Sequence, residues 1–221
     1  MFKATCTLIL LIIFCSPNMV LADQQVSQIL EGVQKKYSQL PGLSLPYERE
    51  SITRSMALLG GGINKDLATG RLYFKPPSLV KIQQETPKPE TMYTEGPVLW
   101  YYAPHKNEAY RYPSPDFVQI LGDVFQGLRN VEERFDVVLS KINEDGSCEL
   151  KLSPNPPWTS IQHLELIVSQ MDYTIRKVEI HDSAGGITRF ILGDFRVENS
   201  FPEGFFRFIV PEGVKVIEEE G

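Results

Sequence analysis

The sequence predicts an α+β protein, a strongly curved antiparallel sheet of about 10–11 strands with helices covering its concave apolar side. Many short runs rich in Val, Leu, Ile and aromatic residues end at Pro or Gly, whereas only two segments have helical periodicity. Several runs, such as Val98–Tyr102, are also apolar at adjacent positions. A strand with one wet face alternates in polarity, so these runs indicate apolar material on both faces. An ordinary closed sandwich stays open as the alternative.

Residues 1–22 have the pattern of an export signal that is removed, which leaves residues 23–221 as one domain. Lys3 supplies the positive end, Leu8–Phe14 is apolar, and Val20–Ala22 suits a cleavage site. The apolar run is too short to span a bilayer, and bulky Phe14 disfavours lipid attachment at Cys15.

Composition limits the classes of function. After cleavage Cys148 is the one cysteine left, so an internal disulfide is not expected and the thiol is best explained as a small buried hydrophobe. The formal net charge of −6 becomes −7 without Lys3. This charge argues against nucleic acid and against electrostatic binding to anionic lipid surfaces.

The first half of the chain predicts one helix and a series of strands. Residues 23–40 form an amphipathic helix, with an apolar stripe that includes Val26, Leu30 and Val33. A long strand covers residues 45–59, and four more strands lie between Gly70 and Tyr112.

A second helix begins near Ser114, because a capping serine followed by proline is typical of a helix start, and it extends to Leu128. It is apolar over much of its circumference. The remaining predicted strands cover residues 135–142, 148–152, 163–169, 173–181, 186–197 and 205–210.

Neither catalysis nor metal binding is indicated. His105, His163 and His181 are scattered without the spacing of metal ligands, and no nucleophile motif occurs. We therefore expect a protein that is not an enzyme and that needs no cofactor.

Four motifs in order make the chain resemble the periplasmic outer-membrane lipoprotein carrier family, described as LolA-like. These motifs are Gly70–Leu79, Gly96–Pro104, Met171–Lys177 and Phe206–Ile217. The resemblance implies an open half-barrel whose hydrophobic cavity shields lipoprotein acyl chains between the inner and outer membranes. It also implies an inner-membrane ABC transporter as the loading partner and an outer-membrane lipoprotein receptor as the unloading partner, with the carrier in the periplasm. A monomer is expected, because a carrier that hands over a buried cargo has no evident need of a dimer.

The expected cavity lining combines the helix stripes with aromatic and aliphatic strand residues. It consists of Leu30, Val33, Phe74, Leu99, Tyr101, Phe117, Leu121, Phe125, Phe190 and Phe208.

The sequence departs from the family at Lys75-Pro76-Pro77. Relatives have an arginine at the second of these positions, which bonds the helical lid, and Pro76 cannot donate such a bond. Lys75 and Arg71 are the candidates to replace this latch, although adjacent strand residues face opposite sides.

Three other functions stay open. The same architecture suits a periplasmic domain that senses lipids or lipoproteins, and it suits a carrier of another hydrophobic lipid. An enzyme acting on acyl substrates would need a nucleophile that the sequence does not reveal.

Overall fold

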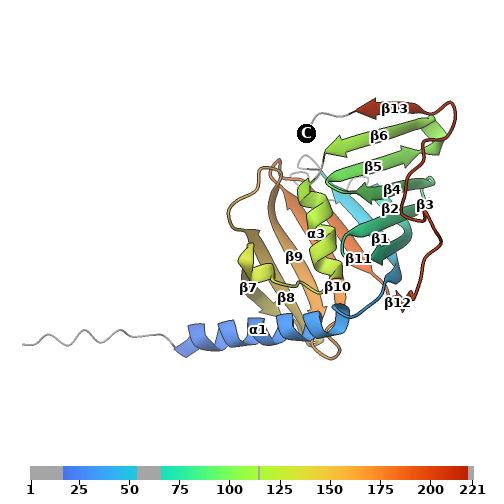
Figure 1. Ribbon diagram of the computed structural model, residues 1–221. Coiled ribbons are helices and arrows are strands. Elements are labelled where there is room, and N and C mark those ends of the chain that lie inside the picture. Colours follow the sequence, from blue (N-terminus) through green and yellow to red (C-terminus); the bar gives the residue numbers. More distant parts are fainter. Residues whose placement is uncertain (1–16, 54–65, 114, 219–221) are drawn as a thin grey trace, which may run out of the picture.

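The computed structural model describes residues 17–53, 66–113 and 115–218, which form one sheet and two α-helices (Figure 1). The helices are α1 (Pro17–Tyr37) and α3 (Pro115–Phe125), with short 3-10 turns at Pro104–Lys106 and Val131–Glu133. The strands are β1 (Leu43–Ile52), β2 (Asp66–Lys75), β3 (Leu79–Thr86), β4 (Glu90–Glu95), β5 (Val98–Ala103), β6 (Glu108–Pro113), β7 (Phe135–Ile142), β8 (Ser147–Pro154), β9 (Ile161–Ser169), β10 (Ile175–Asp182), β11 (Ile187–Leu192), β12 (Arg196–Val197) and β13 (Lys215–Glu218).

The sheet is open and curled. Its order is β13-β6-β5-β4-β3-β2-β1-β11-β10-β9-β8-β7, with β12 paired to β1, so the two ends of the ladder do not meet. Neighbouring strands are antiparallel except β13 and β6, which are parallel. These features confirm the prediction of an open, curled, mostly antiparallel sheet with two helices, although the sheet has 13 strands.

Both predicted helices form, but with other bounds: α1 begins at Pro17 and ends at Tyr37, against 23–40, and α3 ends at Phe125 before the predicted end at Leu128. α1 buries the expected stripe, which includes Val26, Leu30 and Val33. α3 ends before Gly127, whose φ of +82° favours glycine. A Cβ at Gly127 would also lie 2.9 Å from the Val33 carbonyl oxygen, so glycine lets the end of α3 approach α1 closely.

The predicted strand boundaries differ from the structure in several places. β10 begins at Ile175 because Tyr173 has a positive φ of 56° in the preceding turn. The predicted strand at 186–197 is broken into β11 and β12. The long strand predicted at 45–59 begins at Leu43 and ends at Ile52 as β1, and part of the predicted range lies outside the described residues.

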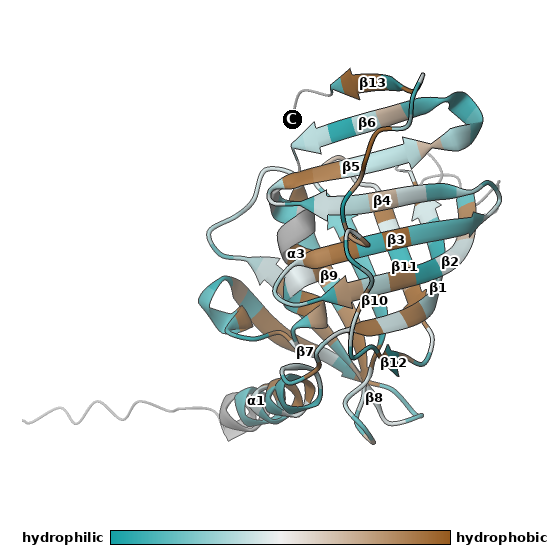
Figure 2. Ribbon diagram, turned by 45° about the vertical axis from the view of Figure 1, so that its right-hand side comes forward, coloured by the Kyte–Doolittle hydropathy of each residue, from teal (hydrophilic) through white to brown (hydrophobic). Residues whose placement is uncertain are grey.

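The predicted strand at 205–210 is wrong. Residues 198–214, which we call the C-terminal strap, cross one face of the sheet without joining its ladder (Figures 1 and 2). Aromatic side chains hold the strap: Phe205 packs on Tyr73 at a ring distance of 5.0 Å, and Phe208 packs on Trp100 at 5.3 Å. Apolar residues at adjacent positions therefore serve here to anchor an irregular segment.

The two faces of the sheet carry different partners. We call the face that packs against α3 the inner face, and the face that carries the C-terminal strap the outer face. Strand alternation divides β5 between them, because Leu99 and Tyr101 point to one side and Trp100 and Tyr102 to the other. Phe208 packs on both Trp100 and Tyr102, which explains why β5 is apolar on both sides.

α1 lies across one end of the sheet, next to the strands of the second half of the chain (Figure 1). The hydroxyl of Tyr37 accepts a hydrogen bond of 3.1 Å from the backbone N–H of Ile175 at the start of β10. The Tyr37 ring lies 5.4 Å from that of Phe195. The end of α1 is thus fixed to the strand that it crosses.

Candidate functional site

An open groove of about 650 Å³ runs along the inner face of the sheet. It extends from β3, β4 and β5 across β1 to β10 and β11, so strands from both halves of the chain form its walls. Its lining consists of Arg49, Ser51, Asp66, Gln84, Pro87, Lys88, Glu90, Met92, Leu99, Tyr101, Tyr112, Pro113, Ser160, Ile161, Ile180, Asp182, Thr188 and Phe190.

One wall of the groove is apolar and aromatic. Met92 and Tyr101 are directly paired across β4 and β5, and Leu99 lies two residues before Tyr101 on the same face. The Tyr101 ring also lies 5.7 Å from that of Tyr110. Burial, together with the nearby carboxylate of Glu90, raises the pKa of Tyr101, so this phenol stays neutral near pH 7.

Polar groups also line the groove, next to the apolar wall and on β1. Gln84 donates hydrogen bonds of 2.9 Å to a Glu90 carboxylate oxygen and to the Lys88 carbonyl. Arg49 lies 4.0 Å from Asp66, but its Nε atom is enclosed and has no hydrogen-bond partner among the described residues. The groove therefore combines an apolar wall with an enclosed hydrogen-bond donor.

Tyr47 adds a second enclosed polar group close to the groove. It neighbours Arg49 on the inner face of β1, and its hydroxyl is buried without a hydrogen-bond partner among the described residues. Burial raises the pKa of Tyr47 to about 12. An unpaired buried hydroxyl has a desolvation cost of about 1–3 kcal/mol.

α3 packs tightly on the inner face beside the groove. Its residues Leu121, Val124 and Phe125 face Leu72, Val178, Phe190 and Leu192, and the space left between them is about 10 Å³. The rings of Phe74 and Phe125 are 5.7 Å apart. Such a gap hardly admits one water molecule, so the volume beneath α3 is filled by side chains.

Three polar contacts hold α3 at different points along its length. Ser160 donates a 2.6 Å hydrogen bond to Asp116 in the first turn, and Arg134 forms a short ion pair with Asp123. Gln126, just after the helix, donates a short hydrogen bond to the carbonyl of Pro77. Burial raises the pKa of Asp123, and Arg134 opposes this shift.

The residues predicted to line a cavity are distributed over four places. Leu99, Tyr101 and Phe190 line the groove. Phe74, Leu121 and Phe125 lie beneath α3, and Phe190 belongs to that contact as well. Leu30 and Val33 belong to the buried core at α1. Phe208 is on the outer face, and the side chain of Phe117 lies outside the described residues.

The two candidate latch residues lie away from α3. Arg71 and Lys75 alternate with Leu72 and Phe74 along β2, and the latter two side chains face α3. Arg71 and Lys75 therefore point to the outer face. The contact that joins this part of the chain to α3 is instead made by Gln126 with the carbonyl of Pro77.

Sequence reasoning did not identify the polar part of the groove. Arg49, Gln84 and Glu90 stand in strands of mixed polarity, where a charged residue is usually solvated. Arg49 stands at an alternate position after Leu45 and Tyr47, so it lies on the buried side of β1. This alternation is the feature of the sequence that could have identified Arg49 as a groove residue.

Comparison with known proteins assigns the chain to a family. A profile of the outer membrane lipoprotein carrier protein LolA matches residues 58–209. The chain belongs to the LolA family. The match covers the groove strands from β2 to β11 as well as α3, whereas β1, which carries Arg49 and Tyr47, precedes the matched residues.

Individual LolA-family relatives are distant in sequence. The outer-membrane lipoprotein carrier protein of Azotobacter vinelandii is 22% identical over 202 residues, which cover 89% of this chain and 87% of the relative. That of Pseudomonas syringae pv. tomato is 23% identical over 170 residues, with coverage of 74% and 78%. A DUF1329 family protein from Desulfovibrio piger has the same fold, with a TM-score of 0.51, 11% identity and coverage of 82% of this chain and 97% of that one.

Neither α1 nor α3, the two α-helices in the described part of this LolA-family chain, is long and apolar enough to cross a membrane.

Proposed function

We propose that this protein is a periplasmic carrier that shields the acyl chains of lipoproteins and moves them from the inner to the outer membrane. The observation that supports this proposal most directly is the open groove on the inner face, with Leu99, Tyr101 and Phe190 in its lining, in a chain of the LolA family. On this proposal the protein is a carrier and not an enzyme.

The physical need for a carrier follows from the cost of exposing acyl chains to water. A chain of about fifteen methylenes, at about 0.8 kcal/mol each, costs on the order of 12 kcal/mol to expose. A lipoprotein with such chains does not cross an aqueous space unaided on a useful timescale. A groove that is partly apolar lowers this cost, and it still allows release to a receptor.

The volume of the groove supports the proposal that α3 moves during loading. About 650 Å³ is within the range of pockets for a single drug-sized ligand, and two or three long acyl chains are larger than that. Phe190 lines both the groove and the contact beneath α3, so displacing α3 joins the two spaces. We infer that α3, with α1 beside it, forms the cover of the concave side.

In this scheme the protein alternates between a covered state and an open state. Gln126, Asp123 and Asp116 hold the cover through polar contacts, and Leu121 and Phe125 hold it through apolar burial. A partner that binds one state better shifts the population towards it. An inner-membrane ABC transporter would favour the open state during loading, and an outer-membrane receptor would favour release.

The enclosed polar groups fit the part of the cargo where acyl chains join the peptide. Ester and amide carbonyls accept hydrogen bonds, and the Nε–H of Arg49 is an enclosed donor without a partner among the described residues. A carbonyl placed at Arg49 would relieve its desolvation cost. The apolar wall at Leu99 and Tyr101 would hold the chains themselves.

The proposal includes the export signal at residues 1–22, the mature domain at 23–221, the periplasmic location and a monomeric state. The export signal, the domain bounds and the periplasmic location follow from the sequence pattern. The monomeric state follows from the handover of a buried cargo, which needs no second copy.

The direct test is uptake of a fluorescent diacylated peptide by the purified protein. Leu99→Glu places a charge in the groove and is expected to reduce binding about tenfold or more. Val138→Glu is the matched control, because Val138 is 57% exposed on β7 and lies outside the groove. Circular dichroism confirms that both variants fold.

Equal binding by folded Leu99→Glu and Val138→Glu proteins would contradict the groove as the cargo site. Mass spectrometry of lipids that copurify with the native protein identifies the cargo. If free lipids copurify in place of lipoprotein, the protein would be a carrier of another lipid and not of lipoproteins. Depletion of a carrier leads to lipoproteins accumulating at the inner membrane, whereas depletion of a sensing domain does not.

A further inference from the structure

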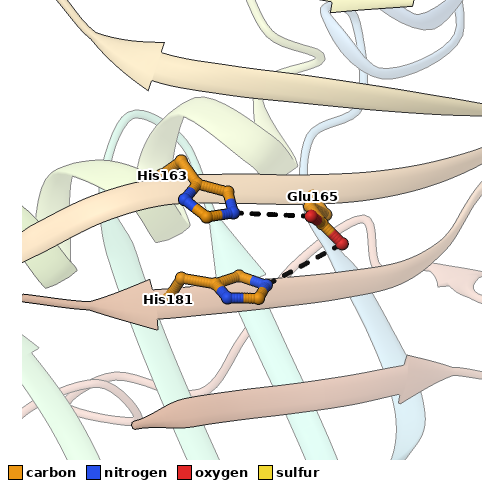
Figure 3. A group of neighbouring side chains, drawn as sticks. All are labelled: His163, Glu165 and His181. Carbon is orange, nitrogen blue, oxygen red and sulfur yellow. Dashed lines mark ion pairs between the residues drawn. The ribbon is translucent and has the colours of Figure 1, made fainter. Parts of the chain in front are cut away.

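Two histidines that are far apart in the sequence come together on β9 and β10. His163 and His181 are directly paired in the antiparallel register, and their rings are stacked with centroids 4.1 Å apart and an interplanar angle of 15° (Figure 3). Glu165 reaches both rings from the same face of β9 (Figure 3). These residues alternate with Leu164 and Ile180, so they lie on the face away from the groove.

The donor atoms of this cluster are spaced like the ligands of one ion. His163 Nε2 lies 3.4 Å from one carboxylate oxygen of Glu165, and His181 Nε2 lies 3.8 Å from the other. The three residues each offer a ligand atom within 4.8 Å of the others. Ligands at about 2.0–2.2 Å from a tetrahedral zinc ion are about 3.4 Å apart, so the three ligand atoms are near the required spacing, and the two stacked rings must rotate towards a common ion.

A second observation is that the enclosed Nε2 atom of His181 has only long contacts to its neighbours. The Nε2 atom of His181 is enclosed, yet it forms no hydrogen bond with any described residue. It lies between two carboxylates, 3.8 Å from Glu165 and 3.6 Å from Glu179. A buried imidazole nitrogen without a hydrogen bond is costly, and coordination of a metal ion would satisfy it.

Glu179 lies on the same side of His181 as the proposed ligands. It is 4% exposed, ion pairs with Arg189 and Lys177 hold its carboxylate, and one of its oxygens lies 3.6 Å from His181 Nε2. Glu179 therefore adds a negative charge next to the three ligands, which favours a cation there.

We propose that His163, His181 and Glu165 form a binding site for a zinc ion on the outer face of β9 and β10. Two imidazoles and one carboxylate are a ligand set that zinc prefers, with the fourth position left for water. The ion would link the two strands on the side opposite the groove. The site is independent of lipid binding, so each proposal can fail without the other.

The test is calorimetric titration of the full-length, tag-free, chelator-treated protein with zinc chloride. We expect one ion per chain, and addition of zinc is expected to raise the unfolding temperature. His163→Gln and His181→Gln are each expected to weaken zinc binding about a hundredfold, because one of three ligands is lost. His105→Gln is the matched control, since His105 pairs with Glu90 elsewhere in the sheet.

Glu165→Gln provides a second variant that leaves both rings in place, and circular dichroism shows whether each protein folds. Absence of zinc binding by the native protein would overturn the proposal. Zinc binding that persists in a folded His163→Gln, His181→Gln double variant, or that disappears equally in His105→Gln, would overturn it as well.

Discussion

A disulfide between α3 and the β2–β3 turn tests whether the helix must move for cargo to enter. A Cβ placed at Gly122 of α3 would lie 3.9 Å from the Cβ of Ser78, and the atom nearest to it would be the carbonyl oxygen of Pro77, at 3.6 Å. Natural disulfides have Cβ–Cβ distances of about 3.8 Å. The double variant Ser78→Cys, Gly122→Cys should therefore oxidise without moving the backbone.

The disulfide should stabilise the fold and block loading at the same time. Closing the loop between residues 78 and 122 removes unfolded-state entropy equivalent to about 4 kcal/mol, which raises the urea midpoint by roughly 1.5 M. Uptake of the diacylated peptide should fall at least about tenfold in the oxidised protein, because the open state is no longer populated.

The assay compares oxidised and reduced samples of the same variant. Dithiothreitol should restore uptake, and the two single-cysteine variants should bind normally in both conditions. Native Cys148 is left in place, because it is buried and burial raises the pKa of its thiol. Normal uptake by protein whose disulfide is verified by mass spectrometry would refute the idea that α3 is a moving cover.

Two further predictions concern stability. Phe208→Ala removes a half-buried ring from three aromatic neighbours, so it should lower the free energy of unfolding by about 2 kcal/mol. Ile209→Ala, 74% exposed, should change it by less than about 0.5 kcal/mol in the same urea titration, and equal effects would contradict the anchoring role of Phe208. For Asp123, burial raises the pKa above its ordinary value of 3.8, so the native state holds this proton more firmly than the unfolded chain does. The free energy of unfolding of the native protein, relative to that of Asp123→Asn, should therefore decline as pH rises from 3.8 through the pKa of folded Asp123. If urea titrations show that this difference rises with pH, the ion pair with Arg134 outweighs the cost of burying Asp123.

The sequence was sufficient to predict the kind of sheet and the need to cover both faces of β5. Alternation is a local property, so an apolar residue at every position of Val98–Tyr102 can be recognised without knowing what lies on either side. The covering groups are not local. Trp100 is covered by Phe208, which is more than a hundred residues away, and only the path of the chain shows this.

The residues of the two proposed sites were harder to predict for the same reason. Arg49 and Glu90 come together in one groove because β1 pairs with β2, β2 with β3 and β3 with β4. His163 and His181 meet because the β9–β10 register places them opposite each other, and a shift of one residue would separate them. Propensity and composition do not fix such registers.

The C-terminal strap gives the two faces of β5 different roles, because one face packs against the strap and the other lines the groove. In β5 the even-numbered residues Trp100 and Tyr102 are packed from outside by Phe208, whereas Leu99 and Tyr101 line the groove. If the proposed carrier function holds, Leu99 and Tyr101 are the positions of β5 that would contact the cargo. Engineering of the groove for a different hydrophobic ligand can therefore begin at Leu99 and Tyr101, while the C-terminal strap is left unchanged.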